Sequence, residues 1–502
     1  MAQDLTKLAF VQARGDYLNG RFVPVSEEGA DGVLVRPSPR DYDDVIARHP
    51  HRTAAVDEAV AAARSAFEGW AQAGLDARMA RMHALRHSLS VHAGELALLI
   101  AREIGKPLWE AETEVQAAIA KIDVTLADGL ALVATREVGG PSQRYAFRPH
   151  GVAAVLGPFN FPLHLVHGHV VPALVTGNTV VVKPSELAPS VAQLYARCCD
   201  EAGLPPGVFN LVQGGAEAGA RLAAHPDVDA VMFTGSFAVG QAIKRATLEQ
   251  PHKLLALELG GRNPALVLAD ADLDKAVHDV LWGAFVTAGQ RCSGTAVALV
   301  EAPRYDAFVA RLLEKVDRLK VGDPLAGAVF MGPLVSEAAR TRYLAALAEA
   351  EHHGAVPLRH AARVEGVPNG AYVTPSVHEV RVTGGKYEQE ELFGPDLAIE
   401  RVGDLDHALA RANASPYGLS ASVFSTDESR FVHAFERLRY GCVNWNAPTC
   451  GASSRLPFGG TKRSGNHRPA ALFSTLYATY PVASLRGPST LDPTKLSPGL
   501  LW

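Results

Sequence analysis

Residues 151–186, GVAAVLGPFNFPLHLVHGHVVPALVTGNTVVVKPSE, decide the fold class of this chain. Residues 151–156 form a short apolar run that ends at Gly157-Pro158, which is typical of a buried parallel strand. A stretch that suits a helix follows at 163–175, and the β-branched run at 179–182 predicts the next strand. The order strand, helix, strand predicts an α/β fold, with a parallel sheet that helices cover on both faces.

The same alternation continues along the chain. In the first sheet we expect one more helix, at 189–202, and two more strands, at 209–212 and 230–233. The pattern resumes after Glu258 and predicts a second α/β domain, with strands at 265–268, 296–300 and 421–424 and helices at 273–288, 305–320 and 405–413. The N-terminal part is rich in helix formers, above all at 56–70 and 78–104. Two strand-like segments, 143–148 and 476–483, lie outside both patterns and are either edge strands or an oligomerisation flap.

The composition narrows the class of function. The chain has 502 residues, too many for one hydrophobic core, so we expect two or three domains. A net charge of −5 argues against a nucleic-acid partner, and the apolar stretches are too interrupted for a membrane span. We expect no secretory signal at the start of the chain. The five cysteines form no C-x-x-C pair, which favours a reducing, cytoplasmic location without disulfides.

Three histidines cluster in the first apolar segment, at His164, His167 and His169. Histidines inside an apolar segment more often pack against their neighbours than bind a metal. The sequence also lacks two histidines at helical spacing that are backed by acidic residues. We therefore predict no metal site.

Cys292 and Glu258 each lie beside glycines, in Gly289-Gln290-Arg291-Cys292-Ser293-Gly294 and Leu257-Glu258-Leu259-Gly260-Gly261. A lone cysteine in such a chain is more often an inert buried thiol than a nucleophile. A thiol and a carboxylate at two glycine-marked turns suit a reaction in which sulfur attacks a carbonyl and a base then activates water.

Two segments that follow predicted strands suit a nucleotide. Gly235, Ser236 and Gly240 lie in GSFAVG, which opens a helix and is either a structural turn or a phosphate-binding turn. Lys183 and Glu186 follow a neighbouring strand, where the carboxylate can accept ribose hydroxyls and repel a 2′-phosphate. In isolation this pair is more often a surface turn. Because both segments end strands of one predicted sheet, together they favour a dinucleotide.

Two further side chains suit the same reaction. Asn160 ends the first strand between prolines and aromatic residues, and its amide is either an oxyanion donor or only a part of the turn. Glu391, in Glu390-Glu391-Leu392-Phe393-Gly394-Pro395, is either a ligand carboxylate beside an aromatic ring or a surface acid.

Together these motifs resemble the aldehyde dehydrogenase superfamily. The matching segments follow the family's order from about residue 150 to 470: 159–162, 177–186, 233–236, 258–261, 289–292, 390–395, 457–460 and 464–465. The resemblance implies a Rossmann-like cofactor domain at 1–125 and 149–257 and a catalytic domain at 258–445. It also implies an oligomerisation flap with a C-terminal tail at 126–148 and 470–502, and a homodimer or a dimer of dimers.

By this resemblance the residues take defined roles. Cys292 would be the nucleophile, Glu258 the base for thioester hydrolysis, and Asn160 a donor of the oxyanion hole. The cofactor would be NAD, with the adenosine ribose held by Lys183 and Glu186, the nicotinamide ribose by Glu391, and the nicotinamide packed against Phe393. A base at position 258 implies hydrolysis of the acyl group rather than its transfer to coenzyme A.

A narrower resemblance, in 285–292, 441–446, 451–469 and 491–500, is to family members that act on N-succinylglutamate 5-semialdehyde, an intermediate of arginine catabolism. Such an acidic substrate needs donors or cations. The candidates are His164, Ser453, Arg455, His467 and Arg468. Two other interpretations stay open: the same chemistry on another acidic or aliphatic aldehyde, and a non-catalytic relative that keeps the fold.

Overall fold

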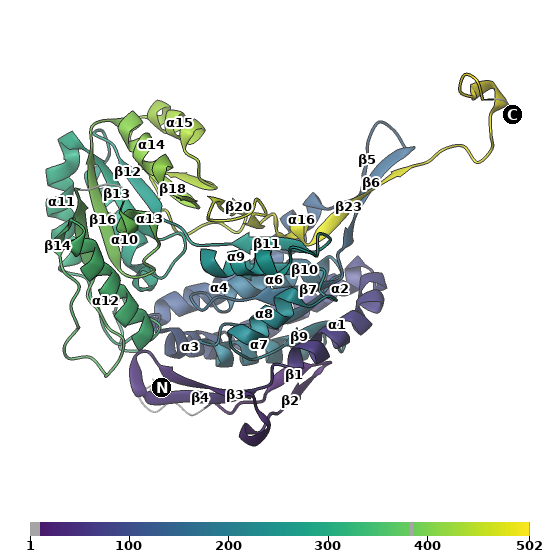
Figure 1. Ribbon diagram of the computed structural model, residues 1–502, viewed down its shortest axis with the longest axis horizontal. Coiled ribbons are helices and arrows are strands. Elements are labelled where there is room, and N and C mark those ends of the chain that lie inside the picture. Colours follow the sequence, from purple (N-terminus) through teal and green to yellow (C-terminus); the bar gives the residue numbers. More distant parts are fainter. Residues whose placement is uncertain (1–10, 382–384, 501) are drawn as a thin grey trace.

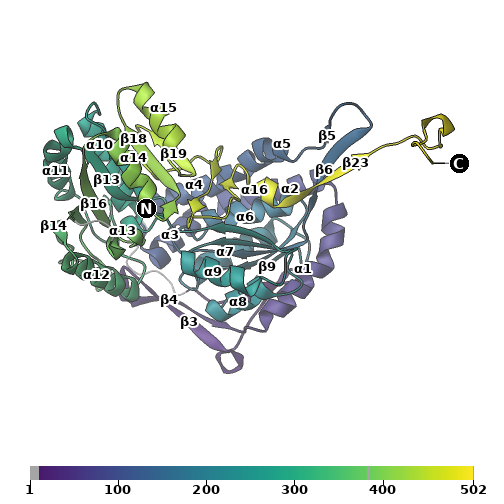
Figure 2. The same ribbon diagram turned by 45° about the horizontal axis from the view of Figure 1, so that its top comes forward.

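The computed structural model describes residues 11–381, 385–500 and 502. Two sheets of seven strands each organise these residues and lie next to each other (Figures 1 and 2). The strands of the first sheet are, in order across it, β11 (Leu254–Glu258), β10 (Ala230–Thr234), β7 (Val152–Leu156), β8 (Thr179–Lys183), β9 (Phe209–Leu211), β1 (Asp16–Leu18) and β2 (Arg21–Val23). The first five of them are parallel, and β1 and β2 add an antiparallel edge.

Helices cover both faces of the first sheet, as the buried run of residues 151–156 predicts. Ala153 and Val155 of β7 pack in one apolar cluster with helices α6 (His164–Val175) and α7 (Pro189–Glu201). Val152 and Ala154 alternate with them and pack in a second cluster. The helices of that cluster are α1 (Ala55–Gln72), α8 (Ala216–Ala224) and α9 (Phe237–Ala246). Behind α6 and α7 lie α2 (Leu75–Val91), α3 (Ala93–Ile104) and α4 (Leu108–Val124).

The second sheet is parallel except at one edge. Its order is β14 (Ala355–Arg359), β15 (Ser376–Val380), β16 (Asp396–Val402), β13 (Thr295–Glu301), β12 (Asn263–Val267), β18 (Ser420–Phe424) and β19 (Cys442–Trp445). Its helices are α10 (Leu273–Phe285), α11 (Ala302–Val316), α12 (Glu337–His352), α13 (Lys386–Gln389), α14 (Leu405–Ala414) and α15 (Glu428–Arg437). The second α/β unit predicted after Glu258 is therefore present.

A separate small sheet projects from the body of the molecule (Figure 1). Its strands are β23 (Thr479–Leu485), β6 (Gln143–Pro149) and β5 (Arg136–Glu137), all antiparallel. The strand-like segments at 143–148 and 476–483 thus pair with each other, and neither is an edge strand of a large sheet. The remaining pairs are β3 (Gly32–Ser38) with β4 (Asp41–His51), β17 (Tyr417–Gly418) with β21 (Thr461–Lys462), and β20 (Pro457–Phe458) with β22 (Ala470–Ala471).

Several boundaries differ from the sequence prediction; the helix expected at 305–320, for example, is α11 at Ala302–Val316. The stretch 78–104 is two helices, because the chain leaves helical geometry at His92, whose ring contacts Glu95 and Glu201. The segment 476–483 begins in a short helix, α16 (Ser474–Tyr477), and becomes a strand only at Thr479. The stretch 273–288 stops being α-helical at Phe285, because the next residues form the turn that carries Cys292. In the described part of the chain, no helix is both long and apolar enough to cross a membrane.

Candidate active site

Cys292 lies in a turn whose backbone is held in an unusual conformation. Thr287 and Ala288 have positive φ angles of 57° and 51°, and Gly289 follows with a φ of 68°. Left-handed geometry is strained for residues with a side chain, and such strain concentrates at functional sites. Asn263 at the start of β12 fixes the other side of the turn, because its Nδ2 donates to the Cys292 carbonyl at 2.7 Å and to the Gly294 carbonyl at 2.9 Å.

Glu258 is the last residue of β11 and is buried. Its carbonyl accepts a hydrogen bond from the Gly235 N–H at 3.0 Å, so β11 and the turn after β10 are held together. Its Oε2 atom is buried and has no hydrogen-bond partner among the described residues. Burial raises the pKa of Glu258 well above its usual value. A carboxyl group with a raised pKa and a free oxygen is suited to accept a proton from water.

Two glycines bring Glu258, Glu391 and Cys292 into one site. A Cβ atom on Gly260 would lie 2.2 Å from Glu391 Oε2, and one on Gly261 would lie 2.3 Å from the Cys292 carbonyl oxygen. A side chain at Gly261 would therefore push the two segments apart, and one at Gly260 would displace the Glu391 carboxylate. The turn after Glu258 has no side chain where the other two groups approach it most closely.

The thiol of Cys292 is neutral at rest. Burial raises its pKa to about 12, and the negative charges of Glu391 and Glu258 act in the same direction. The Ser293 N–H and the positive charge of Arg291 oppose this shift. The influence of both carboxylates on one thiol is a second sign that the three groups are close. Because the thiolate is the nucleophile, the thiol must lose its proton before it reacts.

Asn160 follows β7 and is buried, and its side chain points at the Cys292 turn. Its Nδ2 donates to the carbonyl of Gln290 at 2.9 Å. An amide nitrogen carries two hydrogens, so this bond leaves the second one for another acceptor. The structure thus brings Cys292, Glu258 and Asn160, the three residues singled out in the sequence, to segments that contact one another.

The residues expected to bind a nucleotide lie at the carboxyl ends of strands in the first sheet. Lys183 ends β8 and lies 3.3 Å from Glu186 Oε2, and the Glu186 side chain is half exposed. Burial lowers the pKa of Lys183, and Glu186 opposes that shift. Gly235 and Ser236 follow β10, and Ser236 caps α9 by accepting a hydrogen bond from the Val239 N–H. Gly240 lies against Leu259, the neighbour of Glu258.

Glu391 and Phe393 precede β16 in the second sheet. Glu391 Oε1 accepts a hydrogen bond from the Gly261 N–H at 2.8 Å, and burial raises the pKa of this carboxyl to about 8. Phe393 has a positive φ of 52° and meets Phe159 edge to face, with 5.7 Å between the ring centroids. Glu391 therefore belongs to the site rather than to the outer surface.

The candidate substrate residues are less closely assembled. His164 begins α6, and burial together with Lys121 and Lys106 lowers its pKa to about 4, so its ring is neutral near pH 7. Ser453, Arg455, His467 and Arg468 are exposed. Arg455 Nη1 pairs with Asp128 Oδ2 at 2.5 Å, which ties its loop to the segment after α4. In the described residues no hydrogen bond or ion pair joins His164 to the exposed candidates.

Comparisons with known proteins show the family of the chain. The sequence model of the aldehyde dehydrogenase family matches residues 30–479. The chain belongs to the aldehyde dehydrogenase family. The prediction from the sequence motifs is thereby confirmed for the family, the fold and the class of enzyme.

Two curated relatives of this aldehyde dehydrogenase carry the same activity name. N-succinylglutamate 5-semialdehyde dehydrogenase 1 of Caulobacter vibrioides is 45% identical over 440 residues, covering 86% of this chain and 92% of the relative. The N-succinylglutamate 5-semialdehyde dehydrogenase of Chromobacterium violaceum is 42% identical over 477 residues, covering 94% and 97%. Among solved structures, a mutant of aldehyde dehydrogenase C from Pseudomonas syringae in complex with NAD+ and octanal superposes with a TM-score of 0.90 at 33% identity, covering 95% and 98%.

Two residues of the aldehyde dehydrogenase site were missed by the sequence reasoning. Asn263 holds the Cys292 turn, as described above. The side chain of Asn466 forms two hydrogen bonds with the backbone of β11, as a neighbouring strand would. Its Oδ1 accepts from the Leu257 N–H at 2.9 Å, and its Nδ2 donates to the Leu255 carbonyl at 2.8 Å. Both contacts lie on the outer edge of β11, directly before Glu258. A polar residue two positions before the predicted strand 265–268 was the available signal for Asn263, whereas Asn466 lies in a loop without any periodic pattern.

Proposed function

We propose that this aldehyde dehydrogenase oxidises N-succinyl-L-glutamate 5-semialdehyde to N-succinyl-L-glutamate, with NAD as the hydride acceptor, in the catabolism of arginine. The observation that carries the reaction is that the Cys292 turn contacts both other segments: the turn after Glu258 at Gly261, and the Asn160 amide at the Gln290 carbonyl. The substrate rests on the names of the two relatives that are 45% and 42% identical.

The donor set fits NAD. The Ser236-capped start of α9 presents backbone N–H groups, which suit the diphosphate. Glu186, half exposed beside Lys183, can accept hydrogen bonds from the two hydroxyls of the adenosine ribose. Glu391 offers a second carboxylate for the other ribose, and the Phe393 ring lies beside it for the nicotinamide. The carboxylate of Glu186 repels a 2′-phosphate, which favours NAD over NADP.

Cys292 begins the reaction. After its proton passes to a base, Sγ bonds to the aldehyde carbon and the carbonyl oxygen becomes an alkoxide. The second N–H of Asn160 and the backbone N–H of Cys292 donate to this oxygen. NAD, when bound, accepts the hydride that the former aldehyde carbon loses. A thioester to Cys292 remains in the site.

Glu258 completes the reaction. Its carboxylate takes a proton from water, and the water oxygen attacks the thioester carbon. The carbon–sulfur bond then breaks, Cys292 leaves as a thiolate and the product leaves as a carboxylic acid that ionises in water. The burial of Glu258 raises its pKa and so makes it a stronger base for this step. This role assigns the enzyme to hydrolysis and not to acyl transfer to coenzyme A.

The substrate carries one carboxylate on its succinyl group and one on the glutamate α-carbon, so its site needs donors or cations. We assign this role to His164, Ser453, Arg455 and His467. His164 acts as a neutral hydrogen-bond donor because its pKa is low, and Arg455 supplies the positive charge at the exposed end. To bind the substrate, Arg455 must give up its ion pair with Asp128 and pair with a substrate carboxylate instead.

We assign cofactor binding to 1–125 and 149–257, catalysis to 258–445, and subunit contacts to 126–148 and 470–502. The last assignment is supported by the projecting sheet β23–β6–β5 and by the exposure of Tyr480 and Leu485 on β23. Large apolar side chains exposed on an edge strand favour pairing with a second chain. A homodimer or a dimer of dimers is the expected assembly.

The test measures NADH formation by the purified protein on a panel of aldehydes, with Cys292→Ala as the blank. The expected result is a higher kcat/KM for N-succinyl-L-glutamate 5-semialdehyde than for succinate semialdehyde and for octanal. A preference for octanal would keep the mechanism and discard the substrate. No turnover on any aldehyde would discard the proposed activity, and acceleration by coenzyme A would discard the hydrolytic role of Glu258.

A further inference from the structure

Helix α4 carries three buried ionic side chains on one face: Glu110, Glu114 and Lys121. Each is at most 3% exposed. Their spacings of four and seven residues place them along one side of a helix. Buried charges are costly unless they are paired, so the partners of these three residues show what the helix holds.

Glu110 holds the nucleophile turn. Its carboxylate accepts hydrogen bonds from the Thr287 N–H and the Thr287 hydroxyl, the first of them at 3.2 Å. It also pairs with Arg291 Nη2 at 2.9 Å, and Arg291 Nε donates to the Thr287 hydroxyl at 2.7 Å. Glu110 therefore binds the first left-handed residue of the turn and the residue directly before Cys292.

Glu114 holds the segment that follows Asn160. Its Oε1 accepts from the N–H groups of Leu163 and His164, each at 3.1 Å, where α6 begins. Its Oε2 pairs with Lys106 Nζ at 2.6 Å, and both side chains are fully buried. The ammonium of Lys106 lies 3.5 Å from the centre of the Phe161 ring, next to Asn160.

Lys121 holds the segment beside Glu258. Its Nζ donates to the carbonyl of Ala471 at 2.6 Å. Ala471 has a positive φ of 58°, and the preceding residue, Ala470, forms a backbone hydrogen bond with the Glu258 carboxyl group. One helix thus contacts the three chain segments that carry or adjoin the nucleophile, the oxyanion donor and the base.

We propose that α4 is the positioning element of the catalytic centre, and that Glu110 sets the geometry and the electrostatics of Cys292 through Thr287 and Arg291. The inference rests on the proposed function only in naming the reaction that depends on this geometry. The contacts themselves do not depend on the substrate. None of the three ionic residues of α4 is assigned a contact with the substrate or the cofactor.

The proposal has an electrostatic consequence of defined sign. Cys292 is faced by Glu258 from β11, by Glu391 from the segment before β16, and by Arg291 from its own turn. Arg291 lowers the pKa of the thiol, and Glu110 offsets that positive charge. The other titratable groups that face Glu110 and Arg291 are Lys106 and Glu114, which pair with each other, and the buried thiol of Cys450. Loss of Glu110 therefore lowers the pKa of Cys292, whereas loss of Arg291 raises it.

The experiment measures the rate of Cys292 alkylation by iodoacetamide against pH in the full-length protein, without aldehyde or NAD. The alkylated Cys292 peptide is quantified by mass spectrometry, because Cys442 is also partly exposed. Because the pKa of Cys292 is raised, its alkylation rate between about pH 7 and 9 is proportional to a small thiolate fraction. For Glu110→Gln we expect the rate at each pH to rise by about tenfold, and for Arg291→Gln to fall by about tenfold, the change that one unit of pKa produces. In the double variant the rate returns toward the wild-type value.

Opposite shifts distinguish this role from a purely structural one, because a packing defect has no reason to change sign between the two variants. Rates that stay fixed, or that change in the same direction in both variants, would overturn the proposal. If Glu110→Gln does not fold, Glu110→Asp is the deciding variant, because it keeps the charge on a shorter side chain. We expect it to have a lower alkylation rate than the wild type at every pH, and an unchanged rate would overturn the proposal.

The matched control is Glu400→Gln. Glu400 is also a buried carboxylate paired with an arginine, Arg411, but it lies on β16 facing α14, away from the turn. We expect it to alter stability without moving the Cys292 profile. Because the readout needs no turnover, an enzyme inactive on every aldehyde but with the two opposite shifts would discard the proposed function and keep this inference.

Discussion

The two seven-stranded sheets share one architecture, but the candidate site residues lie at opposite ends of their strands. In the first sheet, the chemistry follows the strands: Lys183 ends β8, Ser236 comes after β10, and Glu258 ends β11. In the second sheet it precedes them, because Cys292 comes before β13 and Glu391 before β16. The proposed active site therefore lies where the carboxyl ends of one sheet face the amino ends of the other.

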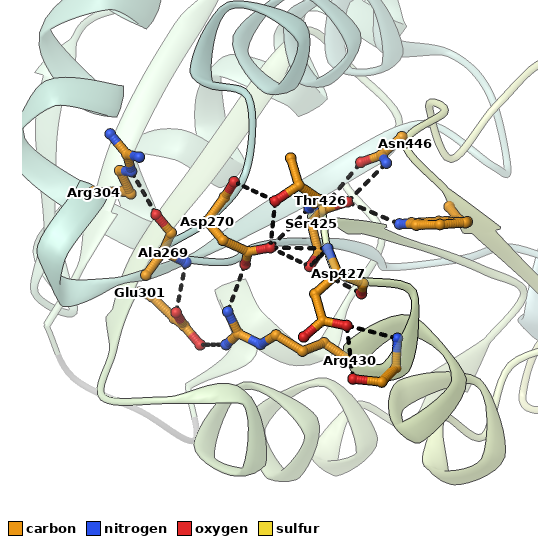
Figure 3. A network of polar contacts seen from close by, with 11 residues as sticks. Ala269, Asp270, Glu301, Arg304, Ser425, Thr426, Asp427, Arg430 and Asn446 are labelled. Atoms are coloured by element: carbon orange, nitrogen blue, oxygen red, sulfur yellow. Dashed lines mark hydrogen bonds and ion pairs between the residues drawn. The ribbon is translucent and has the colours of Figure 1, made fainter.

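The carboxyl ends of the second sheet are closed by an ionic network instead (Figure 3). Asp270 Oδ2 accepts hydrogen bonds from the Ser425 hydroxyl and from the Thr426 and Asp427 N–H groups. Arg430 bridges Asp270 and Glu301, each at 2.5 Å. A parallel sheet commonly binds ligands beyond these ends. Here the charged side chains that could bind a ligand are paired with each other. We therefore infer that this end of the second sheet contributes to stability and not to ligand binding.

The largest effect is expected from Glu258→Gln, which removes the proposed base at the carboxyl end of the first sheet. Glutamine keeps the shape but cannot accept a proton from water, so we expect kcat to fall by roughly 10²–10⁴-fold. The first turnover does not need this base. A rapid burst of NADH near one equivalent per active site should therefore persist, measured by stopped-flow absorbance. Cys292→Ala, the control, should lose the burst too, and a lost burst in Glu258→Gln would place its role before hydride transfer.

A smaller effect of the same kind is expected from Lys121→Met. Methionine fills similar space but cannot bond the Ala471 carbonyl, which lies next to the residue that contacts Glu258. A hydrogen bond to a charged group contributes roughly 1.5–3 kcal/mol, so a loss in kcat of about tenfold is expected, with the burst preserved. Lys121→Arg should restore most of the activity. A reduced burst amplitude would show that α4 holds Cys292 and Glu258 as one unit.

Local sequence signals predicted the strands and helices around the site but not the contacts between them. The β-branched run at 179–182 and the apolar run at 151–156 carried enough periodicity to locate β8 and β7. The helix expected at 273–288 was too long by three residues, because Glu110, far away in the chain, stabilises left-handed geometry at Thr287. Nothing near residue 287 encodes that contact.

The site residues also divide into those with a local sequence signal and those without one. Cys292, Glu258 and Asn160 lie beside glycines or prolines, and such turn residues mark sharp changes in chain direction. The α4 glutamates look like any solvated acids of an amphipathic helix, and only the fold reveals that they are buried. The positions of β16 beside β13 and of β18 beside β12 are likewise set by pairings between distant segments.

Asp270→Asn tests the closed end of the second sheet and should leave kcat unchanged. Burial alone would raise the pKa of Asp270, but hydrogen bonds from Ser425 and Thr426 outweigh it and lower the pKa to about 2. A lowered pKa stabilises the fold above the unfolded value near 3.8, and this stabilisation is lost as the pH falls toward 2. At neutral pH the variant should lose about 1–2 kcal/mol in the free energy of unfolding, measured in urea.

The control for that measurement is Asp306→Asn, which removes an exposed partner of Arg401. Exposed ion pairs contribute little, so its stability should stay within about 0.5 kcal/mol of the wild type. As the pH falls toward 2 the wild type and Asp270→Asn should converge, because the wild-type carboxylate is then protonated. A large loss of kcat with intact stability would mean that this end also serves the reaction.

The smallest effect is expected from Glu186→Gln, which sharpens the assignment of the first sheet to NAD. The Glu186 side chain is half exposed, so water and salt screen its repulsion of a 2′-phosphate. We therefore expect the ratio of kcat/KM for NAD to that for NADP to fall by only about threefold at moderate ionic strength. The change should combine a modest loss with NAD, from a weaker ribose contact, and a gain with NADP.

Ionic strength separates the two contributions. The gain with NADP is electrostatic and should shrink as salt rises, whereas the loss with NAD reflects a hydrogen bond and should stay. Lys183 lies 3.3 Å from Glu186, so its charge is released in the variant and adds to the attraction of the phosphate. Lys183→Met in the same background should remove that part. If the ratio does not move in either variant, the adenosine ribose is held elsewhere, and the carboxyl end of β8 is not the site that discriminates between the cofactors.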